Sequence, residues 1–250
     1  MNWQNCIEHS IKFKTPPPES FFYKLKAHDV GFEGQSILLL TANNGKLAFE
    51  FAKRGLQVTA VDQSSDFIEE AKQQAAKQNL KIDFRHCPAE DIPLEAHNYD
   101  VILIHQGLKY LNIPKILVEA RRLLTPGGFL VTSHIRWLPR LDIIAKKSED
   151  IILKYNSKWE NFDFTGEIYP MPKWAEQALQ LRAMFFYDEN LEYTQENWIG
   201  RLKASGSLSG SLSRSKLLDF EKDLKDVISE IKDGDLEIRH RIDAHIFQFK

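Results

Sequence analysis

Hydrophobic residues alternate along the chain between short continuous runs and longer stretches with helical spacing. The runs at 37–40, 58–61 and 99–104 are almost entirely apolar, as expected for parallel strands buried on both faces. Segments 45–53 and 113–124 instead place apolar residues three and four positions apart, which predicts helices. Strands and helices that alternate at this spacing predict an α/β fold with a doubly wound parallel sheet.

The pattern changes after His134. The following stretch is rich in aromatic residues and proline, which favours a lid over a further strand–helix–strand repeat. Farther along, 205–215 is rich in serine and glycine and is predicted to be a mobile loop, 217–231 has the apolar stripe of an amphipathic helix, and 238–249 alternates as a strand does. We therefore predict one domain of residues 1–250, with a cofactor-binding core at 15–135, a lid or substrate insertion at 137–192, and C-terminal helices with a closing strand at 193–250.

Composition narrows the class of protein. Of 250 residues, 43% are hydrophobic and 27% charged, and the net charge of -2 gives no field that would attract nucleic acid or an anionic membrane. No apolar run approaches the roughly 20 residues of a membrane span, and the N-terminal stretch lacks the apolar core of a signal peptide. Cys6 and Cys87 lie far apart without metal-ligand spacing. These features predict a cytoplasmic protein without a disulfide framework or a metal site.

Two features carry candidate chemistry. The first strand is followed by Thr41-Ala42-Asn43-Asn44-Gly45 and a helix, and ligands of open α/β sheets bind at the carboxyl ends of the strands. Backbone N–H groups at such a helix N-terminus can hold an anion. Asp62 ends the second strand, where a carboxylate can accept hydrogen bonds from ribose hydroxyls. Its spacing from Gly45 also suits a nicotinamide protein, and it could equally serve as a helix N-cap.

The order of five motifs over roughly residues 12–135 resembles the class I S-adenosylmethionine-dependent methyltransferases, in particular the group with the common bacterial small-molecule methyltransferase domain. The motif at 119–133, in which a helix ends in Leu-Thr-Pro-Gly-Gly and enters a strand, is the most specific. The resemblance implies a Rossmann-like, seven-stranded, mostly parallel sheet whose last strand is antiparallel. The motifs are SILLLTANNGKLAFEFAKRG, VTAVDQSSDFIEEAKQQA, CPAEDIP, YDVILIHQGLKYL and EARRLLTPGGFLVTS.

The same resemblance implies a binding site for S-adenosylmethionine. The loop residues Thr41, Ala42, Asn43 and Gly45 would surround the amino-acid part of the cofactor. Thr41 and Asn43 stand where the family has glycine, and Leu39 stands where it often has an acidic residue. Asparagine tolerates a left-handed backbone better than most residues, so the loop can keep its path.

The resemblance also implies contacts to the ribose and the adenine of the cofactor. Asp62 would bind the ribose hydroxyls, and Gln63 would lie beside the adenine. Ala89 and Glu90 would flank the adenine ring, although Pro88 replaces a residue that is often polar in the family. The alternative for Glu90 is an ordinary charge on a surface loop.

His105 and Gln106 end the fourth strand and would face the methyl group and the acceptor. His105 is the candidate general base, because histidine titrates near neutral pH, and a structural role is the alternative. A run of aromatic residues would either line an acceptor pocket or form the core of the lid. This run comprises Trp159, Phe162, Phe164, Tyr169 and Trp174.

The sequence therefore predicts a methyltransferase that moves a methyl group from S-adenosylmethionine to a small-molecule acceptor by direct SN2 displacement. It sets neither the acceptor atom nor the oligomeric state. The first alternative is a non-catalytic protein of the same fold that binds a metabolite or a protein partner, motivated by the altered loop and by Leu39. The second is a nicotinamide oxidoreductase, which would need a GxGxxG motif that is absent after the first strand.

Overall fold

The computed structural model describes residues 9–250, which form two compact units. Unit 2 consists of Pro16–Ile135, Ile168–Phe186 and Ile242–Lys250. Unit 1 consists of Arg136–Glu167, Tyr187–Arg241 and the segment that ends at Thr15. These units follow other boundaries than the single domain with an insertion that the sequence suggests, and that division stays a prediction. Within the described residues, no helix has the length and apolar composition needed to cross a membrane.

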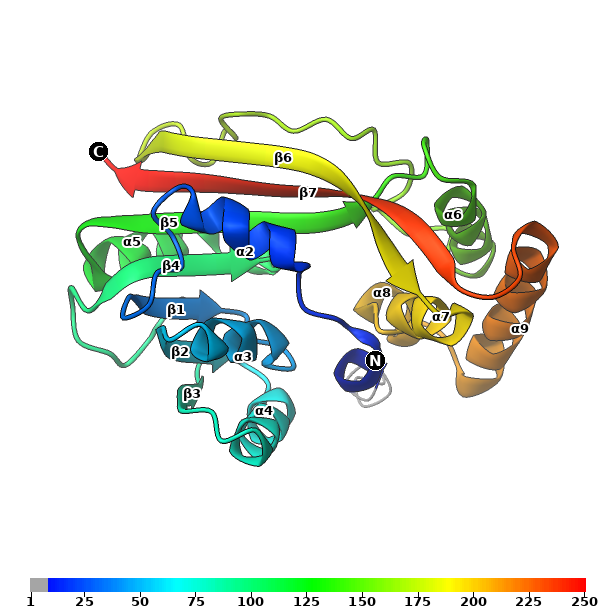
Figure 1. The fold of residues 1–250 in the computed structure, drawn as a ribbon, viewed down its shortest axis with the longest axis horizontal. Helices are drawn as coiled ribbons and strands as arrows, with labels where there is room; N and C mark the ends of the chain where they lie inside the picture. The colour runs from blue at the N-terminus through cyan, green and yellow to red at the C-terminus, as the bar shows by residue number, and fades with distance from the viewer. Residues whose placement is uncertain (1–8) are drawn as a thin grey trace. The chain divides into compact units, whose positions relative to one another are not determined.

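A seven-stranded sheet with the order β3-β2-β1-β4-β5-β7-β6 organises the fold. The pairs β1–β2, β1–β4, β2–β3 and β4–β5 are all parallel. The arrow of β7 runs opposite to those of β5 and β6 (Figure 1). The predicted Rossmann-like, mostly parallel sheet with an antiparallel last strand is confirmed. The strands are β1 (Ser36–Leu40), β2 (Gln57–Asp62), β3 (Ile82–His86), β4 (Tyr99–His105), β5 (Leu124–Trp137), β6 (Leu179–Tyr193) and β7 (Leu236–Phe249).

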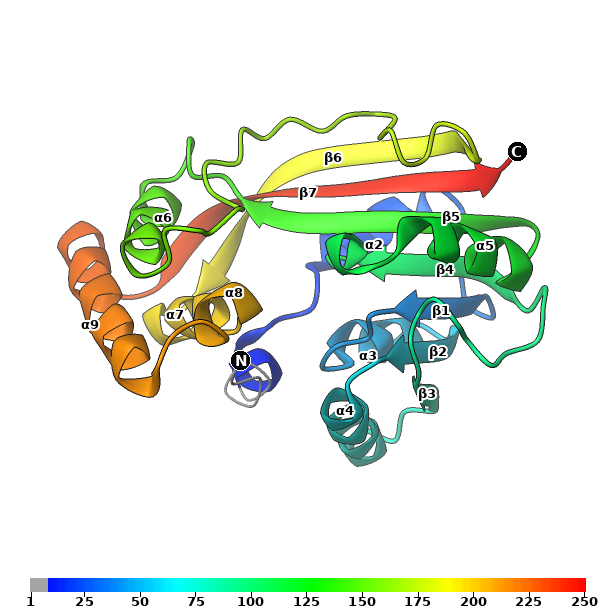
Figure 2. The same cartoon turned by 180° about the vertical axis from the view of Figure 1, so that it is seen from behind.

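Both faces of the sheet in unit 2 are covered, which explains why its central strands are apolar throughout. On one face, Leu38 and Leu40 of β1 belong to the same core as Ile116 and Ala120 of helix α5 (Ile113–Leu123), and this helix lies on the side seen in Figure 2. On the other face lies α2 (Glu19–Lys26), whose Phe21 is fully buried.

Side-chain caps set where the helices of unit 2 begin. The Ser64 hydroxyl accepts the N–H of Phe67 and starts α4 (Ser65–Lys77), and the Asn112 amide oxygen accepts the N–H of Lys115 at the start of α5. Helix α3 (Lys46–Lys53) starts instead at Gly45, without a side-chain cap. The short helix η1 (Leu108–Tyr110) follows β4.

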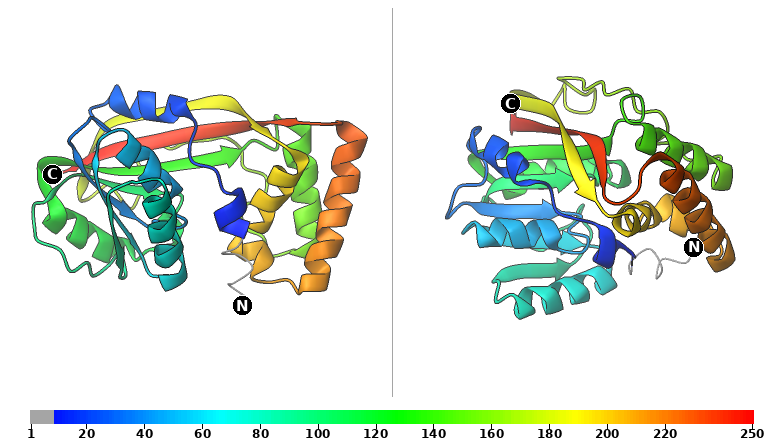
Figure 3. Two further views of the ribbon diagram at one scale, coloured as in Figure 1. Left: turned by 60° about the horizontal axis from the view of Figure 1, so that its bottom comes forward. Right: turned by 45° about the vertical axis from the view of Figure 1, so that its right-hand side comes forward.

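Unit 1 is a helical cluster with a separate apolar core. It contains α6 (Ile143–Tyr155), α7 (Gln195–Lys203), α8 (Gly206–Ser209) and α9 (Arg214–Ile231). Figure 3 shows α6 and α7 packed beside α9, with the fully buried Trp198 and Phe220 in the core between them. The amphipathic helix predicted at 217–231 is confirmed. The stretch 205–215 is not purely a loop, because it contains α8 and the first turn of α9.

The structure departs from the predicted elements around strand β5. Residues 125–128 have the sequence Thr-Pro-Gly-Gly, which is typical of a turn before a strand, yet they belong to β5 itself. Pairing with β4 is irregular there: β5 advances from Leu124 to Phe129 while β4 advances only from Tyr99 to Val101. The extra residues form a β-bulge, with Gly127 at a φ of 84°. A sequence pattern of Pro-Gly-Gly is typical of a turn and does not distinguish it from a bulge.

Candidate functional site

The loop after β1 has a left-handed backbone at alternate positions. The φ angles are 60° at Thr41, 54° at Asn43 and 75° at Gly45. The N–H of Ala42 donates to the carbonyl of Val61 at 2.8 Å, and the N–H of Gly45 donates to the carbonyl of Ala42 at 3.1 Å. The loop therefore follows a path that suits glycine, although two of its three left-handed positions carry side chains.

Thr41 is the strained member of this loop. A β-branched residue at positive φ is an outlier, because its Cβ crowds the backbone. A Cβ atom built on Gly107 would lie 2.2 Å from Thr41 Oγ1, so the two residues touch closely. Thr41 Oγ1 is also buried without a hydrogen-bond partner among the described residues. Strain and an orphaned polar atom coincide here, as they often do at ligand sites.

Gly45 is required by packing as well as by its backbone conformation. A Cβ atom at this position would lie 2.8 Å from the Cβ of Ala71 and 3.0 Å from the ring of Phe49. The loop thus rests directly on α4, and the one glycine that it retains is the one that no other residue can replace without displacing a neighbour.

Asp62 fastens the loop to the end of β2. Its Oδ2 accepts the N–H of Asn43 at 2.9 Å, and its Oδ1 accepts the N–H of Ser64 at 2.9 Å. The N-cap of α4 is Ser64, so the alternative role of Asp62 as the N-cap is wrong. A carboxylate has about four acceptor positions. The half-buried Asp62 therefore keeps acceptor capacity for further donors.

Lys46 lies at the first position of α3 and was missed by the sequence analysis. It is half-buried, and burial lowers the pKa of its ammonium group. The positive end of the helix dipole also disfavours a cation there. An anion bound at this helix terminus would offset both effects, and lysine beside the glycine-like loop is the signal that could have indicated it. Leu39, at the position where the related family often has an acidic residue, is buried at 3% exposure.

The segment predicted to flank an adenine lies beside Asp62. The N–H of Cys87 donates to the carbonyl of Asp62 at 3.1 Å. Ala89 is buried in the core below, so only its backbone is available to a ligand, and the Glu90 carboxylate accepts the N–H of Asn112 at 2.8 Å. Gln63 is exposed, and its carbonyl lies 3.1 Å from His86 Nε2.

His105 and Gln106 lie at the end of β4, and the side chains of both contact polar groups of β5. His105 Nδ1 lies 2.9 Å from the Ser133 hydroxyl, and its ring packs 6.0 Å from that of Phe21 on α2. Gln106 has a left-handed backbone, with a φ of 57°, and its amide nitrogen donates to the carbonyl of Ile135 at 2.7 Å.

Strand register brings most of these residues to one edge of the sheet. Leu40 pairs with both Val61 and Ile104, so the loop, Asp62 and His105 follow three adjacent strands at the same level. The strand order reverses between β1 and β4, and such a switch point is where open α/β sheets bind ligands. The candidate site is this edge, with the backbone of 41–45, the Asp62 carboxylate and the end of β4 around it.

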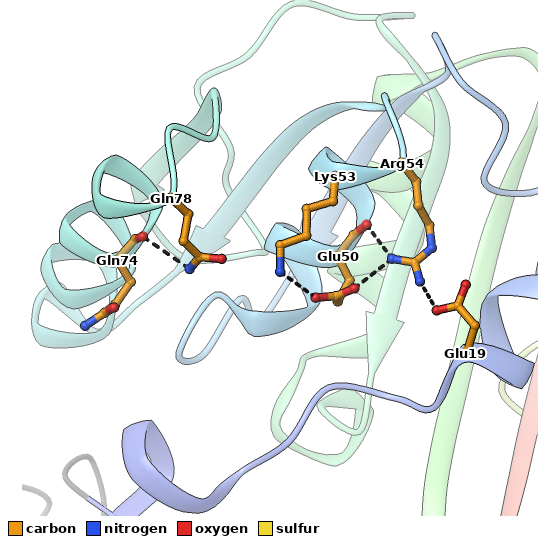
Figure 4. A network of polar contacts seen from close by, with 6 residues as sticks. All are labelled: Glu19, Glu50, Lys53, Arg54, Gln74 and Gln78. Atoms are coloured by element: carbon orange, nitrogen blue, oxygen red, sulfur yellow. Dashed lines mark hydrogen bonds and ion pairs between the residues drawn. The ribbon is translucent and has the colours of Figure 1, made fainter.

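A pocket of unit 2 lies near the C-terminal end of α3, away from the candidate site. Its walls include Glu19, Phe22 and Arg54. Figure 4 shows Arg54 between Glu19 and Glu50, with Lys53 also donating to Glu50. Partial burial raises the pKa of Glu50, but the hydrogen bonds from Arg54 and Lys53 outweigh it and hold that pKa below its ordinary value. The ion pair between Arg54 and Glu19 joins the C-terminal end of α3 to α2.

The aromatic run suggested as an acceptor pocket is divided between the units. Trp159 is buried in the core of unit 1, whereas Phe162 is 42% exposed, and the ring of Phe164 stacks on Arg136. Tyr169 and Trp174 belong to unit 2, where Trp174 packs against Phe247. Cys6 lies outside the described residues, so the expectation for the two cysteines is not tested.

One comparison with known protein families matches a segment of unit 2. Residues 38–132 match the family described as a methyltransferase domain. The ubiquinone biosynthesis O-methyltransferase of Roseobacter denitrificans is 29% identical over 145 residues, which are 56% of this chain and 58% of that protein. The enzyme of the same name from Caulobacter sp. strain K31 is 30% identical over 137 residues, 52% of this chain and 54% of its own length. The chain thus spans little more than half the length of these curated relatives.

Solved structures share the fold at low sequence identity. The MccD protein superposes with a TM-score of 0.58 at 16% identity, covering 94% of this chain and 99% of that one. A protein from Galdieria sulphuraria, assigned as a sarcosine dimethylglycine methyltransferase, gives a TM-score of 0.55 at 17% identity, covering 91% and 83%. At this level of identity the likeness concerns the fold alone.

Proposed function

We propose that this protein transfers a methyl group from S-adenosylmethionine to a small-molecule acceptor, because residues 38–132 match the methyltransferase domain family and the sheet has a Rossmann-like strand order. The observation that carries the proposal is the glycine-like backbone of the loop at 41–45. Its path is kept at the cost of strain at Thr41, and strain of this kind persists where function requires it.

The residues present at the site fit the cofactor. The orphaned Thr41 Oγ1 and the remaining acceptor positions of Asp62 offer polar contacts that the protein itself leaves unused. In the proposal, Asp62 holds the ribose hydroxyls, and the loop residues Thr41, Ala42, Asn43 and Gly45 hold the amino-acid end. Lys46 and the N-terminus of α3 favour the carboxylate of that end.

The other proposed contacts use the neighbouring strand ends. Gln63, the backbone of Ala89 and the loop of Glu90 border the adenine, and His105 with Gln106 borders the methyl group. When bound, S-adenosylmethionine supplies a methyl group attached to a positively charged sulfur. The protein aligns the acceptor with this methyl group for direct SN2 displacement and excludes water, so that catalysis comes mainly from proximity and desolvation.

The acceptor in this proposal is a small molecule that reacts through oxygen, as the name of the curated relatives says of those proteins. The net charge of -2 supports a small acceptor over nucleic acid. We include a cytoplasmic location, which the absence of a CxxC or disulfide pattern supports.

The proposal is tested by calorimetric titration of the full chain with S-adenosylmethionine and S-adenosylhomocysteine. We expect micromolar dissociation constants for both. Absence of binding at millimolar ligand would instead favour a non-catalytic protein of this fold. That second function has one specific observation in its favour, because the Thr41 side chain occupies space beside Gly107 that a glycine would leave open.

A further inference from the structure

Strand β7 buries a carboxylate in the middle of an apolar segment. Asp243 is 1% exposed, and its neighbours Ile242 and Ala244 are fully buried on the opposite face. Burying a charge is costly unless it is paired and hydrogen-bonded. A strand with a purely structural role would carry an apolar residue here, so the placement of Asp243 requires a reason.

The carboxylate of Asp243 is paired with a histidine of the neighbouring strand. His134 Nδ1 lies 3.0 Å from Asp243 Oδ2, and the His134 side chain is 29% exposed. An ionised carboxylate only accepts hydrogen bonds, so the His134 ring carries its proton on Nδ1. Its Nε2 then presents a lone pair, and no residue in the described part of the chain bonds to that atom.

A second histidine lies near the same carboxylate, beyond hydrogen-bonding distance. His245 Nδ1 lies 3.9 Å from Asp243 Oδ2, and its Nε2 lies 2.9 Å from the carbonyl of Tyr169. The His245 ring is itself buried, at 6% exposure. Asp243 is therefore enclosed between two rings, of which only the one on β5 reaches the surface. This arrangement holds the exposed ring of His134 in one orientation.

Strand register brings the backbone of His134 to the level of the candidate site, with its side chain on the face of the sheet opposite to Ser133. Ser133 pairs with His105, the last residue of β4, so His134 extends one residue beyond that level. Neighbouring strands lie about 4.8 Å apart, and β4 is the one strand between β5 and β1. His134 therefore lies near the same edge of the sheet as the loop at 41–45. The backbones of β5 and β1 are about 10 Å apart there.

We propose that His134 is the general base that takes the proton from the acceptor hydroxyl, with Asp243 as its positioning residue. The inference rests on the proposed methyl transfer. At His105, the candidate from the sequence, the Ser133 hydroxyl beside Nδ1 can donate or accept, so this contact does not set the tautomer. The partner of His134 is the carboxylate of Asp243, which only accepts hydrogen bonds and therefore sets the tautomer of His134.

The step balances within the proposed reaction. The acceptor oxygen bonds to the methyl carbon as the carbon–sulfur bond breaks, and the electron pair of that bond remains on sulfur. The hydroxyl proton passes to His134 Nε2 and later to water. Imidazole can deprotonate a hydroxyl as acidic as a phenol, whose pKa is about 10. The acceptor class that fits this base is therefore a phenol or catechol.

The test compares His134→Gln and Asp243→Asn with the wild-type chain, using His97→Asn as the control. His97 is an exposed histidine in the loop before β4, at the far edge of the sheet. Methyl transfer is assayed with catechol and 3,4-dihydroxybenzoate, and affinity for S-adenosylhomocysteine is measured by calorimetry. Nitrogen-15 NMR of the histidine rings reports the His134 tautomer independently of activity.

We expect His134→Gln to lower kcat by 10²–10⁴-fold while the affinity for S-adenosylhomocysteine stays within twofold. We expect the wild-type spectrum to show the proton on His134 Nδ1 and Asp243→Asn to lose that signature and activity together. Because Asp243 is buried, its variant is first checked for folding by circular dichroism. His134→Gln at a partly exposed position keeps the test valid if Asp243→Asn does not fold.

The remaining outcomes separate the two proposals. A wild-type kcat retained within threefold by His134→Gln, or a His134 proton on Nε2, would overturn the assignment of the base and leave the proposed function intact. Binding of S-adenosylhomocysteine without turnover of either phenol would also overturn the base and its acceptor class. Absence of cofactor binding would overturn the proposed function itself.

Discussion

The backbone N–H of Asn43 donates to Oδ2 of Asp62 at 2.9 Å, across 19 positions of sequence. The carboxylate proposed to hold the ribose therefore also holds the loop that would receive the rest of the cofactor. One side chain couples two parts of the candidate site, so its removal should affect both.

Asp62→Ala should weaken the binding of S-adenosylhomocysteine by about 1.5–3 kcal/mol, the scale of hydrogen bonds to a charged group. The expected loss includes the loosening of the loop at Asn43. Calorimetry measures the affinity, and Asp66→Ala in the exposed first turn of α4 is the control. An unchanged dissociation constant in a folded Asp62→Ala protein would remove Asp62 from the cofactor site.

Thr41→Gly should stabilise unit 2 by about 1 kcal/mol. Relief of a left-handed β-branched residue gains about 1–2 kcal/mol, and removal of an unpaired buried hydroxyl adds to the gain. Greater chain freedom of glycine in the unfolded state subtracts about 0.5–1 kcal/mol. Urea unfolding followed by circular dichroism measures the change. A loss of stability would mean that the strain inferred from the φ of 60° is absent.

Gly45→Ala should destabilise unit 2 by roughly 2–4 kcal/mol, because it adds a contact at 2.8 Å with Ala71 to an unfavourable φ. Gly34→Ala is a matched control: its φ is 85°, but a Cβ there meets nothing within 4 Å. Gly34→Ala should lower the stability of unit 2 by only about 1 kcal/mol, which comes from the unfavourable φ alone. Equal losses in the two variants would show that packing against Ala71 does not matter.

The buried His240 should make unit 1 sensitive to acid. Burial, together with the charge of Arg201, lowers the pKa of His240 from 6.5 to about 3. Between these values the unfolded chain binds a proton that the folded chain does not, so stability falls as the pH decreases below about 6.5. The slope from this one group is at most about 1.4 kcal/mol per pH unit.

This slope is measured by urea unfolding between pH 7.5 and 4.5, followed by circular dichroism and by tryptophan fluorescence, to which Trp198, packed edge-on against His240, contributes. His240→Leu should reduce the slope of stability against pH by the contribution of one proton relative to the wild-type chain. The same slope in wild type and His240→Leu would show that His240 does not report on acid unfolding.

The sequence predicted the elements whose burial is regular and missed features that depend on distant pairing. The central strands follow from the continuous apolar runs alone. Asp243 and His245 alternate with apolar residues, a pattern that suggests a solvated face, because a single strand does not show that the sheet is covered on both sides. The pairing of Asp243 with His134 spans 109 positions and leaves no local signal.

At the candidate loop, the sequence suggested a larger change than the structure shows. Counting glycines at 41–45 indicated a departure from the related family, yet the φ angles show that the backbone path was retained with Thr41 and Asn43 in place. Backbone conformation is imposed here by the hydrogen bonds of Ala42 and Asp62. Such contacts arise only once β1 and β2 have paired, so residue preference alone does not predict them.

The β-bulge at residues 125–128 decides which histidine faces which side of the sheet. Ser133 and His134 are consecutive in β5, so they point to opposite faces, one toward His105 and the other toward Asp243. A one-residue slip of β5 would exchange them. The Thr-Pro-Gly-Gly motif lies at the other end of β5. The number of residues in it nevertheless sets which side chains of β5 point to each face of the sheet. A single deletion there should therefore break both pairs without touching either histidine.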